Sequence, residues 1–222
     1  MSNAEYVQRL RIQFSKFGPT RFISHLDVAR TWERALNRAK IPMAYSQGFN
    51  RRPRMSFATA TPLGTTSDFE IVDIWTKEVL NPDETATRIT EKMAPGIQLL
   101  DIKEVPTSGK KLQVLTIDST FEIKITEDIG REELKQKVAD LLAADEILRE
   151  RVVKKKLKQF DLRPMVYDLE VLDGEEGEPI VLVARLALEP SKTGRVDQVL
   201  LQLGLDPLDA KVHRTHVTLI EE

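Results

Sequence analysis

The 222-residue sequence contains no cysteine and only three histidines. Without cysteine the chain forms no disulfide, holds no thiolate zinc site or cysteine-bound iron–sulfur cluster, and offers no thiol nucleophile. Three histidines leave little material for a metal centre. The ten glycines are scattered and form neither a phosphate-binding loop nor a dinucleotide-binding fingerprint. We therefore expect this chain to bind no metal and no cofactor.

Long hydrophobic runs are also missing. No apolar stretch approaches the ~18 residues needed to span a bilayer, and the first residues lack the basic and apolar regions of a signal peptide. The composition is 41% hydrophobic and 31% charged, which is enough apolar residue for a packed core. We expect a folded, cytoplasmic protein of one large or two small domains that does not enter a membrane.

The formal net charge of −2 conceals an uneven distribution of charge. Residues 1–60 carry 11 basic and 3 acidic side chains, whereas the remainder carries 22 basic and 32 acidic ones. A second basic run lies at residues 151–163. Charge separated in this way favours an anionic partner, and nucleic acid is the commonest large anion in the cytosol. The alternative is that each basic run is only a solvated face.

The hydrophobic periodicity predicts the same order of elements in both halves of the chain. In the first half the expected strands span residues 8–16, 43–46 with 54–60, 69–76 and 97–105, and the helices begin at Ser24 and Asn81. In the second half the expected strands span residues 120–125, 151–172 (one strand bent at Pro164), 180–188 and 210–220, and the helices span 131–144 and 196–203.

Each half thus reads as a strand–helix–strand–strand–helix–strand unit. This order matches the split βαβ unit of ferredoxin-like proteins. The sequence therefore predicts an α+β protein of two tandem ferredoxin-like (βαββαβ) units with antiparallel sheets. The expected domains are residues 1–106 and 112–222, joined by a linker at 107–111 that is rich in turn-forming residues.

Polar, basic and aromatic residues concentrate between residues 21 and 56. We expect the following residues to contact substrate: Arg21, Ser24, His25, Asp27, Arg30, Arg34, Tyr45, Phe49, Asn50, Arg51, Arg52 and Arg54. Free amide groups at a helix start, with Arg side chains around them, suit phosphate or carboxylate, and aromatic rings can stack on unpaired bases. The loop at 47–53 is expected to approach the helix start.

The second half adds basic residues to this predicted surface. They are Lys154, Lys156, Lys158, Arg163 and Arg214. No metal site is expected there, because His213 and His216 lie three apart in a predicted strand and should point to opposite faces.

Each candidate also has a purely structural interpretation. Ser24 and Asp27 are typical capping residues, and Tyr45 and Phe49 can simply pack. His25 beside Asp27 has the residue types of a general acid or base, but no nucleophile or metal ligand accompanies it in the sequence. A structural or ligand-contacting histidine is the preferred interpretation.

Several motifs extend over nearly the whole chain. They are Arg21-Phe-Ile-Ser-His-Leu-Asp27, Glu33-Arg34-Ala35, Ala44-Tyr-Ser-Gln-Gly-Phe-Asn50, Pro53-Arg-Met-Ser-Phe-Ala58, Pro62-Leu-Gly64, Asp161-Leu-Arg-Pro164 and His213-Arg214-Thr215. Together they closely resemble the motifs of the radical-SAM-linked proteins, a bacterial family of unknown function. The family usually has Pro-His where this chain has Arg51-Arg52, which weakens a ligand or base at that point and favours anion binding.

The resemblance implies a partner, because such proteins are encoded beside or fused to a radical-SAM protein, which often carries a cobalamin-binding region. We expect a non-catalytic accessory module that binds an anionic substrate, tRNA or rRNA, for that partner. One alternative is a metal-independent RNA-processing or RNA-modifying enzyme that uses His25, Asp27 and Tyr45. The other is a protein-interaction scaffold that docks the radical-SAM partner.

Overall fold

A computed structural model describes residues 6–47, 49–153, 156–175 and 177–220. The chain divides into two compact units, residues 1–115 with 220–222 and residues 116–219. Each unit combines an antiparallel sheet with helices, and the described residues contain five α-helices in all, so the protein belongs to the mixed α+β class. The predicted α+β class is confirmed.

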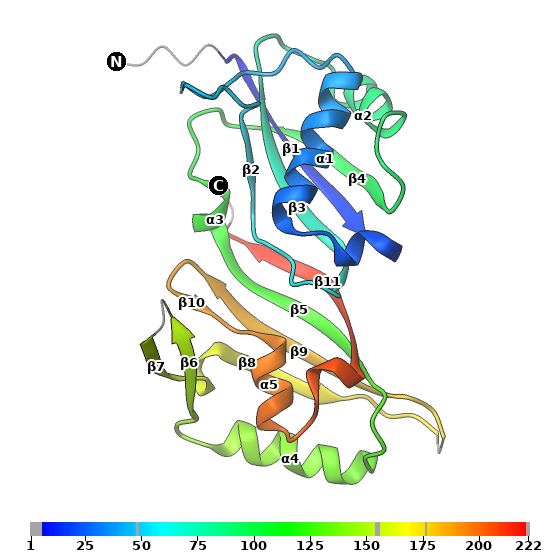
Figure 1. Cartoon of the computed structure of the whole chain (residues 1–222), viewed down its shortest axis with the longest axis vertical. Coiled ribbons are helices and arrows are strands. Elements are labelled where there is room, and N and C mark those ends of the chain that lie inside the picture. The colour runs from blue at the N-terminus through cyan, green and yellow to red at the C-terminus, as the bar shows by residue number, and fades with distance from the viewer. Residues whose placement is uncertain (1–5, 48, 154–155, 176, 221–222) are drawn as a thin grey trace. The chain divides into compact units, whose positions relative to one another are not determined.

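The first unit is a four-stranded sheet in the order β4–β1–β3–β2, with every pair antiparallel and with two helices on one face (Figure 1). Its strands are β1 (Gln8–Lys16), β2 (Met55–Phe57), β3 (Thr66–Thr76) and β4 (Ile97–Val105). Its helices are α1 (His25–Arg38), α2 (Pro82–Thr90) and the short α3 (Leu112–Leu115), with a 3₁₀ turn, η1, at Gly18–Phe22.

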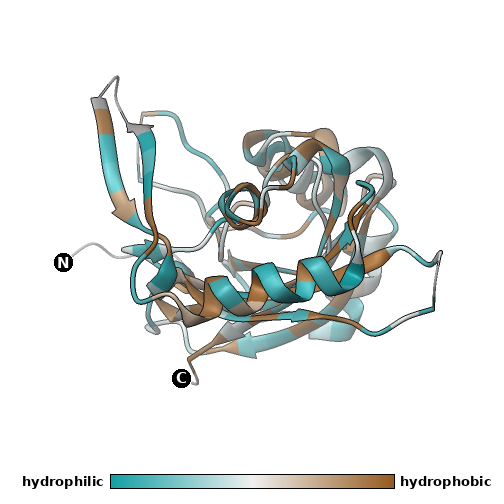
Figure 2. Cartoon of the chain, turned by 90° about the horizontal axis from the view of Figure 1, so that it is seen from below, coloured by the Kyte–Doolittle hydropathy of each residue, from teal (hydrophilic) through white to brown (hydrophobic). Residues whose placement is uncertain are grey.

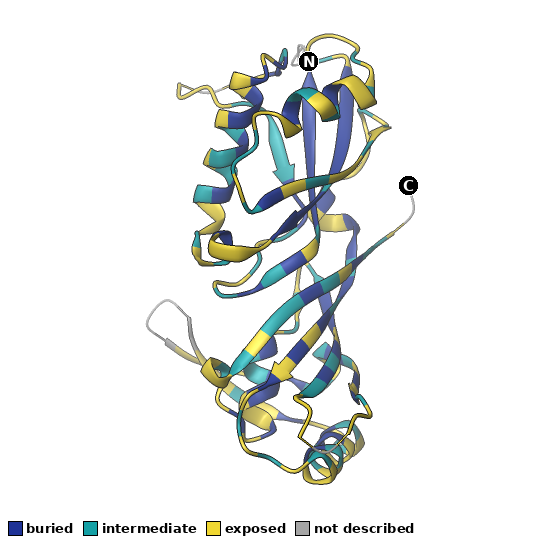
Figure 3. Ribbon diagram, turned by 90° about the vertical axis from the view of Figure 1, so that its right-hand side faces the viewer, coloured by how far each residue is buried: buried dark blue, intermediate teal, exposed yellow. Residues whose placement is uncertain are grey.

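The core of the first unit follows from alternation in β1. Leu10, Ile12 and Phe14 are at most 1% exposed and face the helices, where the fully buried Trp32 of α1 packs its ring edge-on against Phe14 at 5.0 Å. Figure 3 shows the central strands buried along most of their length. The bounds predicted for the strands at 8–16 and 97–105 are confirmed, because a strand with one apolar face has a clear period of two.

The second unit repeats this arrangement, with its sheet in the order β11–β5–β9–β8 and every pair antiparallel. Its strands are β5 (Thr116–Ile125), β6 (Leu148–Val153), β7 (Lys156–Asp161), β8 (Val166–Val171), β9 (Ile180–Glu189), β10 (Lys192–Thr193) and β11 (Ala210–Leu219). Its helices are α4 (Arg131–Ala143) and α5 (Val196–Gln202), with 3₁₀ turns η2 (Arg163–Met165) and η3 (Pro207–Asp209). Both helices pack on one core, and the banding along α4 in Figure 2 reflects its amphipathic sequence.

The prediction of a single strand at residues 151–172 is wrong. The segment forms the hairpin β6–β7, the turn η2 and then β8. In the hairpin register Val153 pairs with Lys156 and Leu148 with Asp161. The sequence does not mark this reversal, because it carries no glycine, proline, asparagine or aspartate between the two strands.

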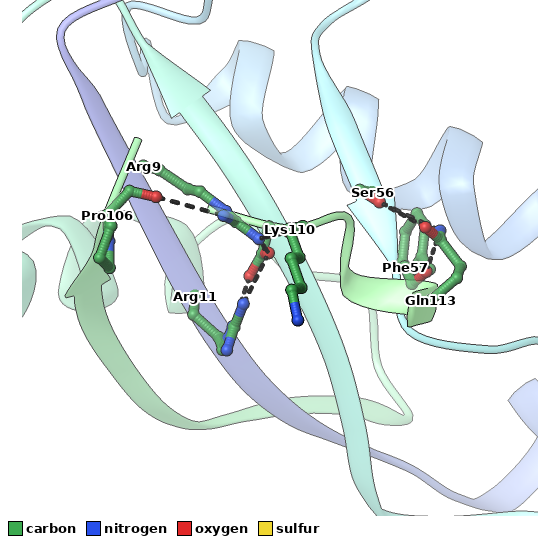
Figure 4. Close-up of polar contacts among 8 residues, drawn as sticks. Arg9, Arg11, Ser56, Phe57, Pro106, Lys110 and Gln113 are labelled. Atoms are coloured by element: carbon green, nitrogen blue, oxygen red, sulfur yellow. Dashed lines mark hydrogen bonds and ion pairs between the residues drawn. The ribbon is translucent and has the colours of Figure 1, made fainter. Parts of the chain in front are cut away.

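The segment expected to be a linker makes specific contacts within the first unit. The guanidinium of Arg9 donates to the carbonyl oxygens of Pro106 (3.2 Å) and Lys110 (3.0 Å). The Gln113 side chain of α3 then donates to Ser56 Oγ (3.0 Å) and to the Phe57 carbonyl (2.5 Å) of β2 (Figure 4). Residues 106–113 are therefore fastened to the sheet at both ends of the segment.

Candidate nucleic-acid interface

The residues expected to form one cluster lie at opposite ends of the first unit. Strand β1 pairs with β3 from Gln8↔Thr76 at one end to Lys16↔Ser67 at the other. Helix α1 begins beyond the Lys16 end, whereas residues 45–54 follow a β-bridge to Thr76 (Figure 1). Nine strand residues span about 30 Å. The prediction that the loop approaches the helix start is therefore wrong.

The described residues 45–47 and 49–54, hereafter the arginine loop, adjoin β3, and Tyr45 and Pro53 form an antiparallel bridge near the base of the loop. Its base is held on β3 by two backbone bonds, from Ala44 N to the Trp75 carbonyl (2.8 Å) and from Trp75 N to the Arg54 carbonyl (3.2 Å). Above this, Ser46 N donates to the Arg52 carbonyl (2.9 Å) and Arg52 N donates to Ser46 Oγ (3.1 Å). These bonds fix the stem of the loop before any ligand binds.

The outer residues of the arginine loop are exposed. Phe49 has a relative exposure of 106% and Tyr45 of 40%, and Asn50, Arg51 and Arg52 are also exposed. The sequence of the loop contains no aspartate or glutamate. A fully exposed aromatic ring beside two arginines, on a loop without carboxylates, is the combination that binds unpaired bases and their phosphates.

Arg54 differs from the other arginines of the loop because its guanidinium lies against two rings. It is 4.4 Å from the ring centroid of Tyr6 and 4.9 Å from that of Trp75. Cation–π contacts of this kind hold the side chain in place. Arg54 is only partly exposed and anchors the base of the loop.

At the other end of the unit, the start of α1 is capped as its sequence predicts. Ser24 Oγ accepts from Asp27 N (3.2 Å) and donates to Asp27 Oδ2 (2.7 Å), and Arg30 Nη1 lies 3.3 Å from Asp27 Oδ1. The Ser24 hydroxyl and the Arg30 guanidinium lower the pKa of the Asp27 carboxyl below its ordinary value. Because an ionised carboxylate already lies at this helix start, the site is poorly suited to a second anion.

His25 lies beside a small cavity rather than a substrate pocket. Its ring meets that of Phe57 edge-on at 5.2 Å, and the cavity below it has a volume of about 10 Å³. Two buried side chains, Lys16 and Glu70, line this cavity, and the sequence analysis did not predict that either is buried. The space holds no more than one water.

The remaining candidates of the first unit lie on or beside α1. Arg34 is exposed on the helix, and Arg21 is partly exposed with its guanidinium 4.6 Å above the Phe22 ring. The Arg21 carbonyl accepts from Gly64 N at 2.8 Å, which joins two of the sequence motifs. Tyr45 lies with the arginine loop, at the far end from His25 and Asp27, so these three side chains do not form a catalytic set.

In the second unit two of the predicted contact residues serve the fold. Arg163 donates to the Leu142 carbonyl (2.9 and 3.2 Å) and to the Val166 carbonyl (2.8 Å), and Arg214 is only 2% exposed. We therefore correct the expectation that Arg163 and Arg214 contact substrate, because the donors of the first are used internally and the second is buried.

The lysines of the second unit remain as candidates where they are described. Lys158 is exposed on β7. Lys156 opens that strand, but its side chain lies outside the described residues, as does the whole of Lys154. The Asp161-Leu-Arg-Pro164 motif braces the base of the hairpin, since Asp161 Oδ1 accepts from Ile147 N (2.8 Å) and Arg163 N (3.0 Å).

The two histidines of β11 are also placed differently from the prediction. A bulge after Arg214 makes His213 pair with Glu122 and His216 with Thr120. Since Glu122 and Thr120 are two residues apart on β5, both histidines lie on the same face of the sheet. Within the described part of the chain, however, no three His, Asp or Glu side chains gather as a metal site requires.

One buried charged network was not predicted. Asp73, which is 0% exposed, accepts from Arg9 Nε (2.9 Å) and Nη2 (2.5 Å) and from Arg11 Nε (2.9 Å) and Nη2 (3.2 Å) (Figure 4). Arg9 and Arg11 alternate with apolar residues in β1, so the sequence favoured solvent exposure for them. Two of the basic residues counted in the first 60 are therefore structural.

The comparisons with known proteins give a family and a fold. A family model described as "Uncharacterized protein conserved in bacteria (DUF2344)" matches residues 9–196. No curated protein matches the chain significantly. Among the described residues, no helix has the length and apolar character needed to cross a membrane.

Solved structures of similar fold include a chain of a Cbf5–Nop10–Gar1 complex, with a TM-score of 0.51 and 12% identity over 96% of this chain and 50% of that one. An H/ACA RNP bound to a substrate RNA containing 2′-deoxyuridine matches with a TM-score of 0.46 (10% identity, 96% and 48% covered), and an archaeal box H/ACA sRNP Nop10–Cbf5 complex with 0.47 (10% identity, 100% and 52% covered). The chain spans about half the length of these solved chains. The match to the Cbf5–Nop10–Gar1 complex shows a similar fold and nothing about function.

Proposed function

The chain belongs to a family of uncharacterized proteins conserved in bacteria (DUF2344), and we propose that it is a non-catalytic module that binds RNA through its arginine loop. The observation that carries the proposal is the fully exposed Phe49 beside the exposed Arg51 and Arg52. In this proposal Phe49 stacks on an unpaired base while the two guanidiniums bind the adjoining phosphates.

The stem of the loop supports this assignment. Backbone bonds between Ser46 and Arg52 and the packing of Arg54 on Tyr6 and Trp75 hold the loop in shape. A loop that is ordered before binding loses less conformational entropy when it contacts a ligand. Ordering the stem of the loop therefore costs little entropy when a ligand binds.

The geometry gives less support to an enzyme. The proposed catalytic residues His25 and Asp27 lie at one end of the first unit and Tyr45 at the other. The cavity beside His25 holds one water at most, so it has no room for a substrate. We therefore favour binding over turnover.

Two finer parts of the proposal rest on other observations. The proposal of a radical-SAM partner rests on the resemblance of the sequence motifs. In this proposal, the RNA that the module presents to the partner is tRNA or rRNA. The assignment of both units as ferredoxin-like rests on their shared strand order, β4–β1–β3–β2 and β11–β5–β9–β8.

Binding to an unpaired RNA oligonucleotide, measured by fluorescence anisotropy over a range of salt concentrations, tests the proposal. Replacement of Arg51 and Arg52 by Glu should weaken binding and lower the salt slope by about 1.4, because each contacted phosphate of a single strand contributes ~0.7. Phe49→Ala should weaken binding by about 1–3 kcal/mol and leave the slope unchanged, since stacking releases no counterions.

The matched control reverses Lys92 and Lys103 to Glu, two exposed lysines of the same unit that are not among the predicted contact residues. It changes the net charge by the same amount as the loop variant. An equal loss of affinity in both variants would assign binding to net charge and not to the loop. If the isolated protein turns over RNA, and if His25→Ala abolishes this turnover without unfolding the protein, the chain is an enzyme and the proposal of a non-catalytic module is wrong.

A further inference from the structure

The hairpin β6–β7 of the second unit separates its side chains by charge. Residues directly opposite each other in an antiparallel pair share a face, and the register pairs Arg149 with Phe160 and Arg151 with Lys158. The other face carries Glu150, which pairs with Gln159. Arg149, Arg151 and Lys158 therefore lie on one face, hereafter the basic face of the hairpin.

Like charges meet directly across the strands at Arg151 and Lys158, an arrangement that destabilises an isolated hairpin. Both side chains are exposed, and among the described residues neither takes part in an ion pair. Among the residues that the structure describes, the hydrogen bond of the Arg149 side chain goes to an amide oxygen, that of Gln202, at 3.3 Å. An anion bound across the two strands would remove this repulsion.

The basic face lacks a platform for unpaired bases. Its one aromatic ring, Phe160, is partly buried against the core of the unit and is covered by the Arg151 guanidinium at 5.2 Å. What the face offers is a row of donors on six-residue strands, about 20 Å long. Such a surface suits the regularly spaced phosphates of a duplex, which presents its backbone without splaying its bases.

The base of the hairpin is held firmly enough to present this face. Asp161 Oδ1 accepts backbone N–H groups from Ile147 and Arg163, and Leu162 N donates to the Ile147 carbonyl at 2.8 Å. The two strands therefore leave the unit from a fixed point.

From this arrangement we infer that the basic face of the hairpin binds the phosphate backbone of base-paired RNA. The inference rests on the proposed function and specifies its substrate: an RNA that contains base-paired as well as unpaired nucleotides. The arginine loop takes the unpaired bases, and Arg149, Arg151 and Lys158 take the paired segment. The duplex contact is independent of sequence, because it reads phosphates and not base edges.

The test compares two probes on the full chain. One is a blunt RNA duplex of about 16 base pairs, the length spanned by known double-stranded-RNA-binding domains, and the other is unpaired oligouridine. Reversal of Arg151 and Lys158 to Glu should lower the salt slope for the duplex by about 1.8, since each phosphate of a duplex contributes ~0.9, and leave oligouridine binding unchanged. Replacement of the same two residues by Gln should also weaken duplex binding and leave oligouridine binding unchanged. These variants introduce no new carboxylate.

The matched control is Lys124→Glu with Lys211→Glu. These two lysines are also exposed and directly opposite across β5 and β11, but Glu122 lies on the same face beside them. The control makes the same charge change and should leave duplex binding as it was. Circular dichroism of each variant verifies that the second unit is folded.

Failure of this inference differs from failure of the proposed function. Loss of oligouridine binding on Phe49→Ala, together with unchanged duplex binding in the hairpin variant, would keep the loop and overturn the hairpin. Equal losses in the hairpin variant and the lysine control would also overturn it. Tighter binding of a DNA duplex of the same sequence, or binding to vesicles of anionic lipid through the same residues, would assign the face to a different partner.

Discussion

The network around Asp73 is the part of the fold whose loss should be most damaging. Asp73→Asn retains the shape of the side chain but removes the negative charge that faces two guanidiniums. Arg9 and Asp73 are both 0% exposed, and Arg11 is 9% exposed. The substitution therefore leaves buried positive charge without its counter-ion.

The expected loss is large compared with the stability of a domain. Breaking a buried ion pair by removing one partner costs about 3–5 kcal/mol, because the remaining charge stays desolvated. A domain is stable by only ~5–15 kcal/mol. For a unit of this size such a loss lowers the melting temperature by roughly 10–20 °C. Unfolding in urea should show the same change in free energy.

The matched control is Asp101→Asn, at an exposed position of β4 in the same sheet. It should change stability by no more than ~0.5 kcal/mol. Combining Asp73→Asn with Arg11→Met should cost less than the sum of the single variants, because both act on one ion pair. A loss below ~1 kcal/mol for Asp73→Asn, or full additivity with Arg11→Met, would show that the network is not a coupled unit.

Two further predictions concern the helix start and the hairpin base. Ser24→Ala removes the hydroxyl that chiefly lowers the pKa of Asp27, so that pKa should rise towards its ordinary value in a ¹³C NMR titration. A carboxyl whose pKa is lowered by folding stabilises the fold at a pH above its pKa in the unfolded chain, and this stabilisation is lost as the pH falls through its pKa in the folded protein. The variant should therefore lose less stability on acidification than the unaltered protein. An unchanged pKa of Asp27 in the variant would contradict the role of the Ser24 hydroxyl. Asp161→Ala leaves the N–H groups of Ile147 and Arg163 without their acceptor and should cost about 1–3 kcal/mol. Hydrogen exchange should then speed up at both amides, and unchanged exchange would show that the hairpin base does not depend on Asp161.

The candidate site shows how far residue types alone can be trusted. The sequence identified the arginine loop by composition, and Phe49, Arg51 and Arg52 are exposed in the structure. It also placed Ser24 correctly as a helix cap, because capping depends on residues within one turn. In both cases the decisive contacts are local.

Contacts between distant segments were not predictable in the same way. By residue type alone, Arg30, Arg163 and Arg214 are equally good candidates for binding an anion. The structure leaves Arg30 exposed, uses the donors of Arg163 on backbone carbonyls and buries Arg214. These fates depend on which carbonyls and rings the fold brings near each side chain, and no local pattern records that.

The sequence by itself determined the limits of strands such as residues 8–16 and the cap at the start of α1, because alternation of apolar side chains and helix caps act over a few residues. Only the tertiary structure decided that the arginine loop and the start of α1 lie at opposite ends of a sheet, that β6 and β7 form a hairpin with one basic face, and that a bulge in β11 brings His213 and His216 to one side. Each of these depends on the register between strands, where a shift of one residue moves every side chain to the other face. Register is set by the packing of the whole sheet, so it is absent from any single segment.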